Sequence, residues 1–255
     1  MKRLGFSLMA IIIVLSGSYS IASSQEPSFI KQVDRAKNSV YRVETKDSVF
    51  LGTAFTINKY GDLLTCFHVA EPKGIRLDSL YLRNYLTATV EQDTVAVQFN
   101  ARFTATIKAR VPLFDLAILH ADTLQAGMRI SYNFMGLTPS TNLQEGQEVA
   151  LCAYIPDDFT IPKAFVSKGI VSTIRERLYD PRLKNTVELI QLDLTAAKGT
   201  SGGPIFLTSS GRVIAIQDAG IFETDMAKQT PYPIALTISQ IVHVLDSLKI
   251  PYDLR

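Results

Sequence analysis

The sequence predicts an all-β fold, a sandwich or a pair of barrels, with one short helix near each end of the folded region. Short runs rich in Val, Ile, Thr and Phe follow one another along most of the chain, separated by Gly, Asn, Asp or Pro. Apolar residues recur at helical spacing only near the two ends of this region. The predicted strands are residues 39–45, 48–57, 62–65, 94–99, 102–111, 116–120, 148–154, 165–174, 187–194, 204–207 and 212–218.

Two helices flank these strands. Residues 28–39 form the first, with Phe29, Ile30, Val33 and Ala36 expected on its buried face. Residues 239–248 form the second, because apolar residues recur there at helical spacing before a proline. The apolar positions of this second helix are Ile241, Val244, Leu245 and Leu248.

The strands divide into two halves, which we place at about 39–132 and about 146–238. The polar, Gly- and Pro-containing stretch from Asn133 to Gly146 is the expected connection between them. The stretch from Lys73 to Asp93 is longer than such a half requires, so we interpret it as an added loop.

Residues 1–24 have the pattern of a secretory signal peptide: a basic start, an apolar run over 8–15, and small residues at Ala22 and Ser24 that fit cleavage after Ser24. Cleavage after Ala22 and an uncleaved signal anchor are the alternatives. We expect an exported protein, periplasmic or extracellular, whose residues 25–255 form one domain without stable membrane insertion.

Composition excludes several classes of protein. The chain has 255 residues, 47% of them hydrophobic, and a formal net charge of +2 without basic clusters, which disfavours disorder and nucleic acid as a partner. Cys66 and Cys152 are too few for a disulfide framework. Each lies among apolar residues, so we expect buried free thiols, with a single disulfide as the alternative. Neither cysteine has potential metal ligands as neighbours, so we expect no bound metal. We also expect no cofactor.

Ser201 lies in the segment KGTSGGP, residues 198–204, between two predicted strands. A serine hydroxyl becomes an effective nucleophile only with backbone N–H groups that stabilise an oxyanion and with a general base. Glycines allow the backbone the close approach that this chemistry needs. A loop without chemistry is the alternative, so the interpretation depends on a base.

The chain has three histidines. His243 lies on the polar side of the last helix and His120 at a strand end, where a surface role is expected. His68 ends a predicted strand and opens a turn, and Asp115 precedes the apolar run 116–119. An aspartate at the edge of a buried strand is suited to orient a catalytic histidine. Structural roles for both residues are the alternative.

The order His68, Asp115, Ser201 and the surrounding motifs resemble the chymotrypsin-fold serine proteases, most closely the bacterial Deg/HtrA-type branch. Because the chain ends soon after its last helix, we expect no appended PDZ domain. The segments that carry the resemblance are GTAF (52–55), LT and HV (64–65 and 68–69), DLAIL (115–119), SKGIVS (167–172), Gln191 with Asp193, and GRVIAI (211–216).

This resemblance implies two six-stranded antiparallel barrels, with His68 and Asp115 on the first, Ser201 on the second, and a polypeptide substrate bound between them. It also implies an oxyanion hole formed by the N–H groups of Gly199 and Ser201. The strand that ends near Ile216 and Gln217 corresponds to the one that pairs with bound peptide, so these two are expected in substrate binding.

Three residues near the serine depart from the digestive proteases. Thr200 replaces an aspartate that pairs with a newly cut N-terminus, so we expect no activation of that kind. Thr195 falls at the floor of the specificity pocket and is neutral, which predicts small or apolar side chains at the cleavage site. Lys198 would instead favour an acidic residue, a weaker alternative.

The predicted function is therefore an exported serine endopeptidase that works through an acyl-enzyme intermediate. A catalytically inactive protease-fold protein that binds peptides is the alternative. An esterase is disfavoured, although GTSGG fits a Gly-x-Ser-x-Gly elbow, because that fold alternates strands with helices and needs its histidine after the serine. The chain offers only His243 there.

Overall fold

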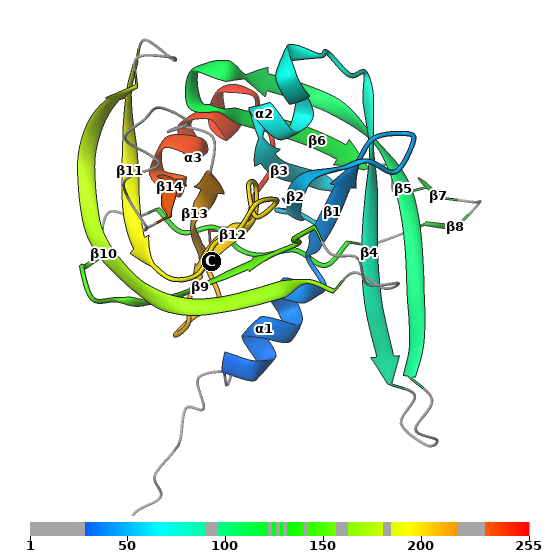
Figure 1. The fold of residues 1–255 in the computed structure, drawn as a ribbon, viewed down its shortest axis with the longest axis horizontal. Coiled ribbons are helices and arrows are strands. Elements are labelled where there is room, and N and C mark those ends of the chain that lie inside the picture. Colours follow the sequence, from blue (N-terminus) through cyan, green and yellow to red (C-terminus); the bar gives the residue numbers. More distant parts are fainter. Residues whose placement is uncertain are drawn as a thin grey trace, which may run out of the picture.

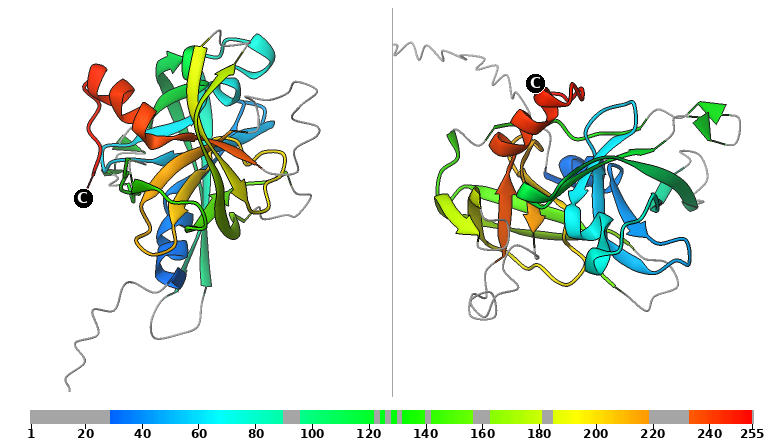
Figure 2. Two further views of the ribbon diagram at one scale, coloured as in Figure 1. Left: turned by 90° about the vertical axis from the view of Figure 1, so that its left-hand side faces the viewer. Right: turned by 90° about the horizontal axis from the view of Figure 1, so that it is seen from above.

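A computed structural model describes residues 29–89, 96–121, 124–125, 128–129, 132–139, 142–156, 163–180, 185–218 and 233–254. It contains two closed six-stranded antiparallel barrels that lie side by side, as Figure 1 and Figure 2 show, and the predicted fold class is confirmed. The predicted signal peptide, residues 1–24, lies outside the described residues. In the described part of the chain, no helix combines the length and the apolar composition needed to cross a membrane.

The first barrel, blue to green in Figure 1, has the strand order β1-β2-β3-β6-β5-β4. Between strands it carries the short helix α2 (Phe67–Ala70) and two 3-10 turns, η1 (Pro72–Gly74) and η2 (Pro112–Phe114). Its strands are β1 (Val40–Glu44), β2 (Phe50–Thr56), β3 (Asp62–Cys66), β4 (Ser79–Thr89), β5 (Ala96–Val111) and β6 (Leu116–Ala121).

The second barrel, yellow-green to orange, has the order β10-β11-β14-β13-β12-β9. A small hairpin of β7 (Leu124–Gln125) and β8 (Met128–Arg129) precedes it, as does the polar connection between the barrels. Its strands are β9 (Glu148–Ala153), β10 (Phe165–Asp180), β11 (Asn185–Asp193), β12 (Pro204–Leu207), β13 (Val213–Asp218) and β14 (Ile234–Thr237).

One apolar cluster joins the two barrels. It includes Phe55 and Leu64 from the first barrel and Tyr154 and Leu236 from the second, all almost fully buried. Burying one Leu, Ile or Phe side chain stabilises the fold by roughly 1.5–3 kcal/mol. This shared core fixes the barrels relative to each other, and therefore fixes the residues at their junction.

The expectation of an added loop between Lys73 and Asp93 is wrong for most of that stretch. Residues 79–89 form β4, which pairs with β1 and β5 and closes the first barrel. The pattern that marks this strand is alternation: Leu80 and Leu82 are buried, while Tyr81 and Arg83 are partly exposed. Similarly, the runs 94–99 and 102–111 are not two strands, because β5 continues through Asn100 with regular pairing to β4.

The flanking helices are α1 (Phe29–Lys37) and α3 (Ile238–Ser247). The expected buried face of α1 is partly wrong, because Ile30 is 72% exposed while Gln32 is buried and its Nε2 donates a hydrogen bond to the Ser209 carbonyl at 3.0 Å. In α3 the apolar stripe packs inward as expected at Ile241, Val244 and Leu245, but not at Leu248, which follows the last helical residue and is 44% exposed.

Candidate active site

The junction of β3 and β6 brings His68 beside Asp115. In this strand pair Cys66 lies opposite Leu116, so the residues that follow and precede them also meet. The Phe67 N–H donates to the Asp115 carbonyl at 2.8 Å, and α2 then carries His68. Asp115 adopts a left-handed conformation (φ 46°, ψ 41°), which aspartate tolerates better than most residues and which turns its side chain back over α2.

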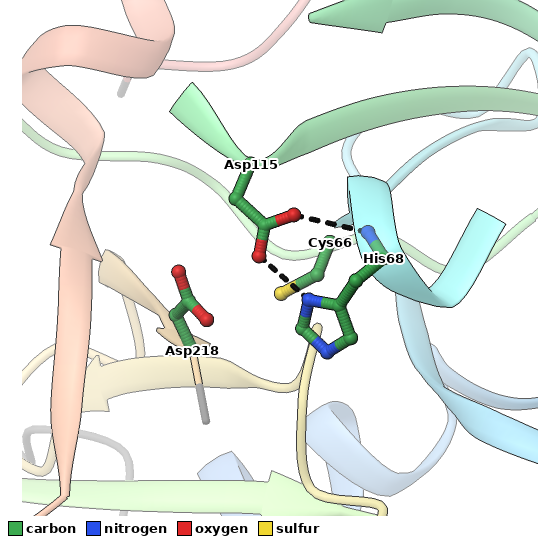
Figure 3. A group of neighbouring side chains, drawn as sticks. All are labelled: Cys66, His68, Asp115 and Asp218. Atoms are coloured by element: carbon green, nitrogen blue, oxygen red, sulfur yellow. Dashed lines mark hydrogen bonds and ion pairs between the residues drawn. The ribbon is translucent and has the colours of Figure 1, made fainter. Parts of the chain in front are cut away.

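The Asp115 carboxylate holds His68 at two points (Figure 3). Its Oδ2 lies 2.6 Å from His68 Nδ1, and its Oδ1 accepts a hydrogen bond from the His68 backbone N–H at 3.0 Å. A carboxylate is an acceptor, so it places the proton of a neutral imidazole on Nδ1 and leaves the lone pair on Nε2. The Asp115 side chain is 10% exposed and that of His68 is 37% exposed. The imidazole is therefore partly accessible to solvent, while the carboxylate that orients it is mostly buried.

A second Asp–His pair lies at the other end of the same two strands. His120 Nδ1 is 2.9 Å from Asp62 Oδ1, and the carboxylate also accepts from Lys108 and Asn58. Burial alone raises the pKa of Asp62, but these three hydrogen bonds outweigh it and lower the pKa. His120 is therefore half-exposed but paired, and His243 is exposed on α3, as expected.

The serine loop, residues 194–203, is fastened to the first barrel by Thr53 of β2. The Thr53 N–H donates to the Ser201 carbonyl at 2.9 Å, and Thr53 Oγ1 donates to the Gly199 carbonyl at 3.0 Å. The same oxygen accepts from the Tyr154 N–H at 2.9 Å. A side chain at Gly52 would collide with Val69, the residue after His68, and would lie 3.1 Å from the Ser201 carbonyl, so the loop sits close to α2.

The N–H groups of Gly199 and Ser201 are the predicted oxyanion donors on the serine loop. The Thr200 carbonyl accepts from the Gly203 N–H at 2.9 Å, and in a trans peptide this directs the Ser201 N–H to the opposite side. Gly199 has φ +92° and packs under the Phe50 ring, 2.3 Å from where a Cβ would lie, so only glycine fits. Among the described residues, neither of these N–H groups donates a backbone hydrogen bond, and the oxyanion hole stays a prediction.

The predicted specificity residues separate into two groups. Thr195 and Lys198 are exposed on the serine loop, and the Thr195 N–H donates to Ser167 Oγ. The prediction that Ile216 and Gln217 contact substrate is wrong for their side chains, because these residues are only 2% and 1% exposed. The Ile216 side chain packs in the apolar cluster that joins the two barrels. The β13 backbone is occupied as well, since it pairs with β12 on one edge and with β14 on the other.

Replacing Thr53 by valine, which has the same shape, is expected to lower kcat/KM for a peptide substrate about tenfold and to lower the melting temperature. Without the hydroxyl, the Gly199 carbonyl and the Tyr154 N–H lose their partner, at a cost of about 1–3 kcal/mol each when buried. Thr53→Ser keeps the hydroxyl and is the control. Equal behaviour of the two variants would show that the hydroxyl does not anchor the loop.

Two residues of the site are not apparent from the sequence: Thr53, which lies within the GTAF motif, and Asp218. Asp218 is the last residue of β13 and is only 4% exposed. Its carboxylate lies beside Cys66, His68 and Asp115. The expectation that Cys66 has no potential metal ligands around it is therefore wrong. These side chains come from both halves of the chain, and a motif in one segment of the sequence cannot reveal that they lie together.

Cys66 and Cys152 are both free and buried, as predicted. Burial, together with the Asp218 and Asp115 carboxylates, raises the pKa of the Cys66 thiol, whose Sγ lies 3.3 Å from the Gln217 carbonyl oxygen. Burial raises the pKa of Cys152 to about 12.

Both thiols are expected to react with iodoacetamide at pH 8 at least about 100-fold more slowly in the folded protein than in urea. The reason is that the thiolate is the nucleophile, and the raised pKa of each cysteine in the folded protein makes its thiolate scarce. Mass spectrometry of timed samples measures the two rates. Native labelling of Cys66 at the unfolded rate would contradict the burial described above.

Two six-stranded barrels, with a His–Asp pair at the end of one and a glycine-rich serine loop from the other fastened beside it, define the class of chymotrypsin-like peptidases. Within that class, the chain belongs to the trypsin-like peptidase family, because the family model described as a trypsin-like peptidase domain matches residues 52–216. No protein with a curated description matches the chain.

Solved structures share this fold. The crystal structure of Deg5 superposes with a TM-score of 0.61 at 21% identity, covering 84% of this chain and 90% of Deg5. The HtrA-type protease AlgW with tripeptide gives 0.64 at 24% identity, covering 87% of this chain and 64% of AlgW. AlgW with decapeptide gives 0.63 at 20% identity, with 87% and 67% covered. These neighbours, HtrA/Deg-type proteases, agree with the resemblance derived from the sequence.

Proposed function

We propose that the protein is an exported serine endopeptidase. Ser201 Oγ attacks the carbonyl carbon of the scissile peptide bond while His68 Nε2 takes the hydroxyl proton. The N–H groups of Gly199 and Ser201 stabilise the oxyanion. His68 then returns the proton to the leaving amine, which departs and leaves an acyl-enzyme on Ser201. Water, activated by the same base, hydrolyses that ester and regenerates the hydroxyl.

The observation that supports this proposal most strongly is the double contact of Asp115 with His68. A base must have a fixed tautomer and a fixed orientation, and the contact at 2.6 Å to Nδ1 with the second bond at 3.0 Å to the backbone provides both. The same carboxylate stabilises the imidazolium that forms when Nε2 takes the proton, because it is 10% exposed and poorly screened by solvent.

Polypeptides are the proposed substrates, with small or apolar side chains at the cleavage site. Thr195 brings no charge to the loop beside Ser201, which argues against Lys or Arg at the cleavage site. The AlgW structures, in which a related fold was solved with a tripeptide and a decapeptide, are compatible with a peptide ligand. Export by residues 1–24 is part of the proposal.

Cleavage-site profiling tests this function. The protein without residues 1–24, incubated with a proteome-derived peptide library and with an unfolded protein, is expected to cut internal bonds after small or apolar residues. Cuts that follow Lys or Arg would overturn the proposed specificity. Binding of peptides without any cut would instead support the inactive, peptide-binding alternative.

A further inference from the structure

We propose that Cys66, His68, Asp115 and Asp218 form a binding site for Zn²⁺, or a divalent ion of similar softness, and that the bound ion switches off His68 as a base. We call these four side chains the junction quartet. Metal binding stands independently of the proposed protease function, whereas the inhibition that follows from it rests on that function.

The quartet is already assembled in the protein (Figure 3). One potential ligand atom from each residue, a sulfur, a ring nitrogen and two carboxylate oxygens, lies within 4.8 Å of every other. In a tetrahedral zinc site with bonds of about 2.0 to 2.3 Å, neighbouring ligand atoms lie about 3.3 to 3.8 Å apart. Reaching that geometry takes side-chain rotations that bring the more distant ligand atoms together. The same rotations separate His68 Nδ1 from Asp115 Oδ2, which lie 2.6 Å apart in the metal-free protein, by roughly an ångström.

Four different elements hold the quartet in place. Cys66 is the last residue of β3, His68 lies in α2, Asp115 follows η2, and Asp218 is the last residue of β13. Cys66 Sγ is 3.3 Å from the Gln217 carbonyl oxygen, so the ends of β3 and β13 are in direct contact. Because the barrels themselves position the ligands, little conformational entropy is lost on binding an ion.

The mixture of donors selects the metal. A thiolate and an imidazole favour Zn²⁺ and disfavour Mg²⁺ and Ca²⁺, which prefer sites made of oxygen alone. Two carboxylates close to a buried sulfur also concentrate negative charge where a dication would lie, since Cys66 is 2% and Asp218 4% exposed. When the metal binds, the Cys66 thiol releases its proton to solvent, and the positive charge of the metal takes the place of that of the proton.

The metal would change His68 through its tautomer. In the metal-free protein Asp115 Oδ2 keeps the proton on Nδ1, which leaves Nε2 as the acceptor. A metal on Nδ1 displaces that proton, so the neutral ring carries its hydrogen on Nε2 instead. A protonated Nε2 accepts no proton from Ser201, and Asp115 no longer orients the ring because it coordinates the ion. A metal ion reaches the site from solvent on the side of the imidazole, because the His68 side chain is 37% exposed.

Cobalt(II) is the probe for binding, because a thiolate–Co²⁺ bond gives an intense near-ultraviolet charge-transfer band. The Ser201→Ala variant, titrated with Co²⁺, is expected to develop this band and to lose it when Zn²⁺ is added. Cys66→Ala removes the band, whereas Cys152→Ala, which deletes the other buried thiol, keeps it. Absence of the band, or its persistence in Cys66→Ala, overturns the proposal.

Asp218→Asn provides a second variant in case Cys66→Ala does not fold, as judged by its thermal melt. The substitution removes one anionic ligand but keeps the shape of the side chain, so Co²⁺ affinity is expected to fall at least about tenfold. An unchanged affinity in Asp218→Asn excludes this carboxylate as a ligand and overturns the quartet.

The consequence for activity is measured separately. Zn²⁺ is expected to inhibit peptide cleavage by the protein with native Ser201, and EDTA to restore it. Relative to its own rate without metal, Cys66→Ala needs at least about tenfold more Zn²⁺ for half-inhibition, while Cys152→Ala needs the same concentration as the native protein. A cobalt band without any peptidase activity leaves the metal site standing and rejects the protease function. Activity without the band does the reverse.

Discussion

Replacing Ser201 by alanine is expected to lower kcat/KM for peptide hydrolysis by about 10⁴-fold or more while leaving the fold intact. The reason is chemical: without Oγ no acyl-enzyme forms, and the remaining oxyanion donors and binding contacts give only slow attack by water. The substitution is mild for the fold, because Thr53 is hydrogen-bonded to the backbone carbonyl of residue 201, which alanine keeps, and not to the serine side chain. A fluorogenic peptide assay measures the rate, and a thermal melt checks the fold.

Ser209→Ala is the matched control for this experiment. Ser209 lies exposed in the turn between β12 and β13, and its backbone carbonyl, which the change preserves, accepts the bond from Gln32. The control is expected to retain the native rate within about twofold. If Ser201→Ala also retained it, Ser201 would not be the nucleophile.

The second large effect is expected from Asp115→Asn, which should lower kcat by about 10³ to 10⁴-fold. The amide keeps an oxygen that can still accept the His68 backbone N–H, now 3.0 Å from Oδ1. However, its NH₂ group then faces His68 Nδ1, and as a donor it favours the tautomer with the proton on Nε2. The ring stays in place but no longer accepts the proton of Ser201.

Asp34→Asn makes the same chemical change on the exposed side of α1 and is expected to be silent. The measurement is kcat at pH 8, together with ring-nitrogen NMR of His68, which reports the tautomer directly. A kcat within tenfold of native in Asp115→Asn would show that the close contact between Asp115 and His68 is structural and not part of the reaction.

Much of the fold was predictable from the chain, because most barrel strands are short apolar runs bounded by turn residues. The failures have physical causes. In β4 the alternation of Leu80, Leu82 and Leu86 is interrupted by Asn84, which is buried and donates a hydrogen bond to the Val40 carbonyl. In β14 the strand has only four residues, Ile234–Thr237, and its length alone does not distinguish it from a loop.

The candidate site was predictable where the chemistry is local. His68 and Asp115 each lie at the end of a buried run, and adjacent strands bring those ends together. Asp218 was not predictable in the same way, because its neighbours are set by contact between barrels. Ile216 and Gln217 show the converse error: a resemblance locates a strand, but only the burial of its side chains shows that they are unavailable to a substrate.

The central claim, that His68 activates Ser201 for nucleophilic attack, is tested most directly by labelling with a fluorophosphonate probe. We expect the protein without residues 1–24 to gain the mass of one phosphonyl group, located on Ser201 by peptide mapping. His68→Ala is expected to slow this labelling by at least about 100-fold, because the base is lost while the loop held by Thr53 remains. Labelling at the same rate in both proteins, or no labelling of Ser201 under conditions that modify a control protease, would contradict the account.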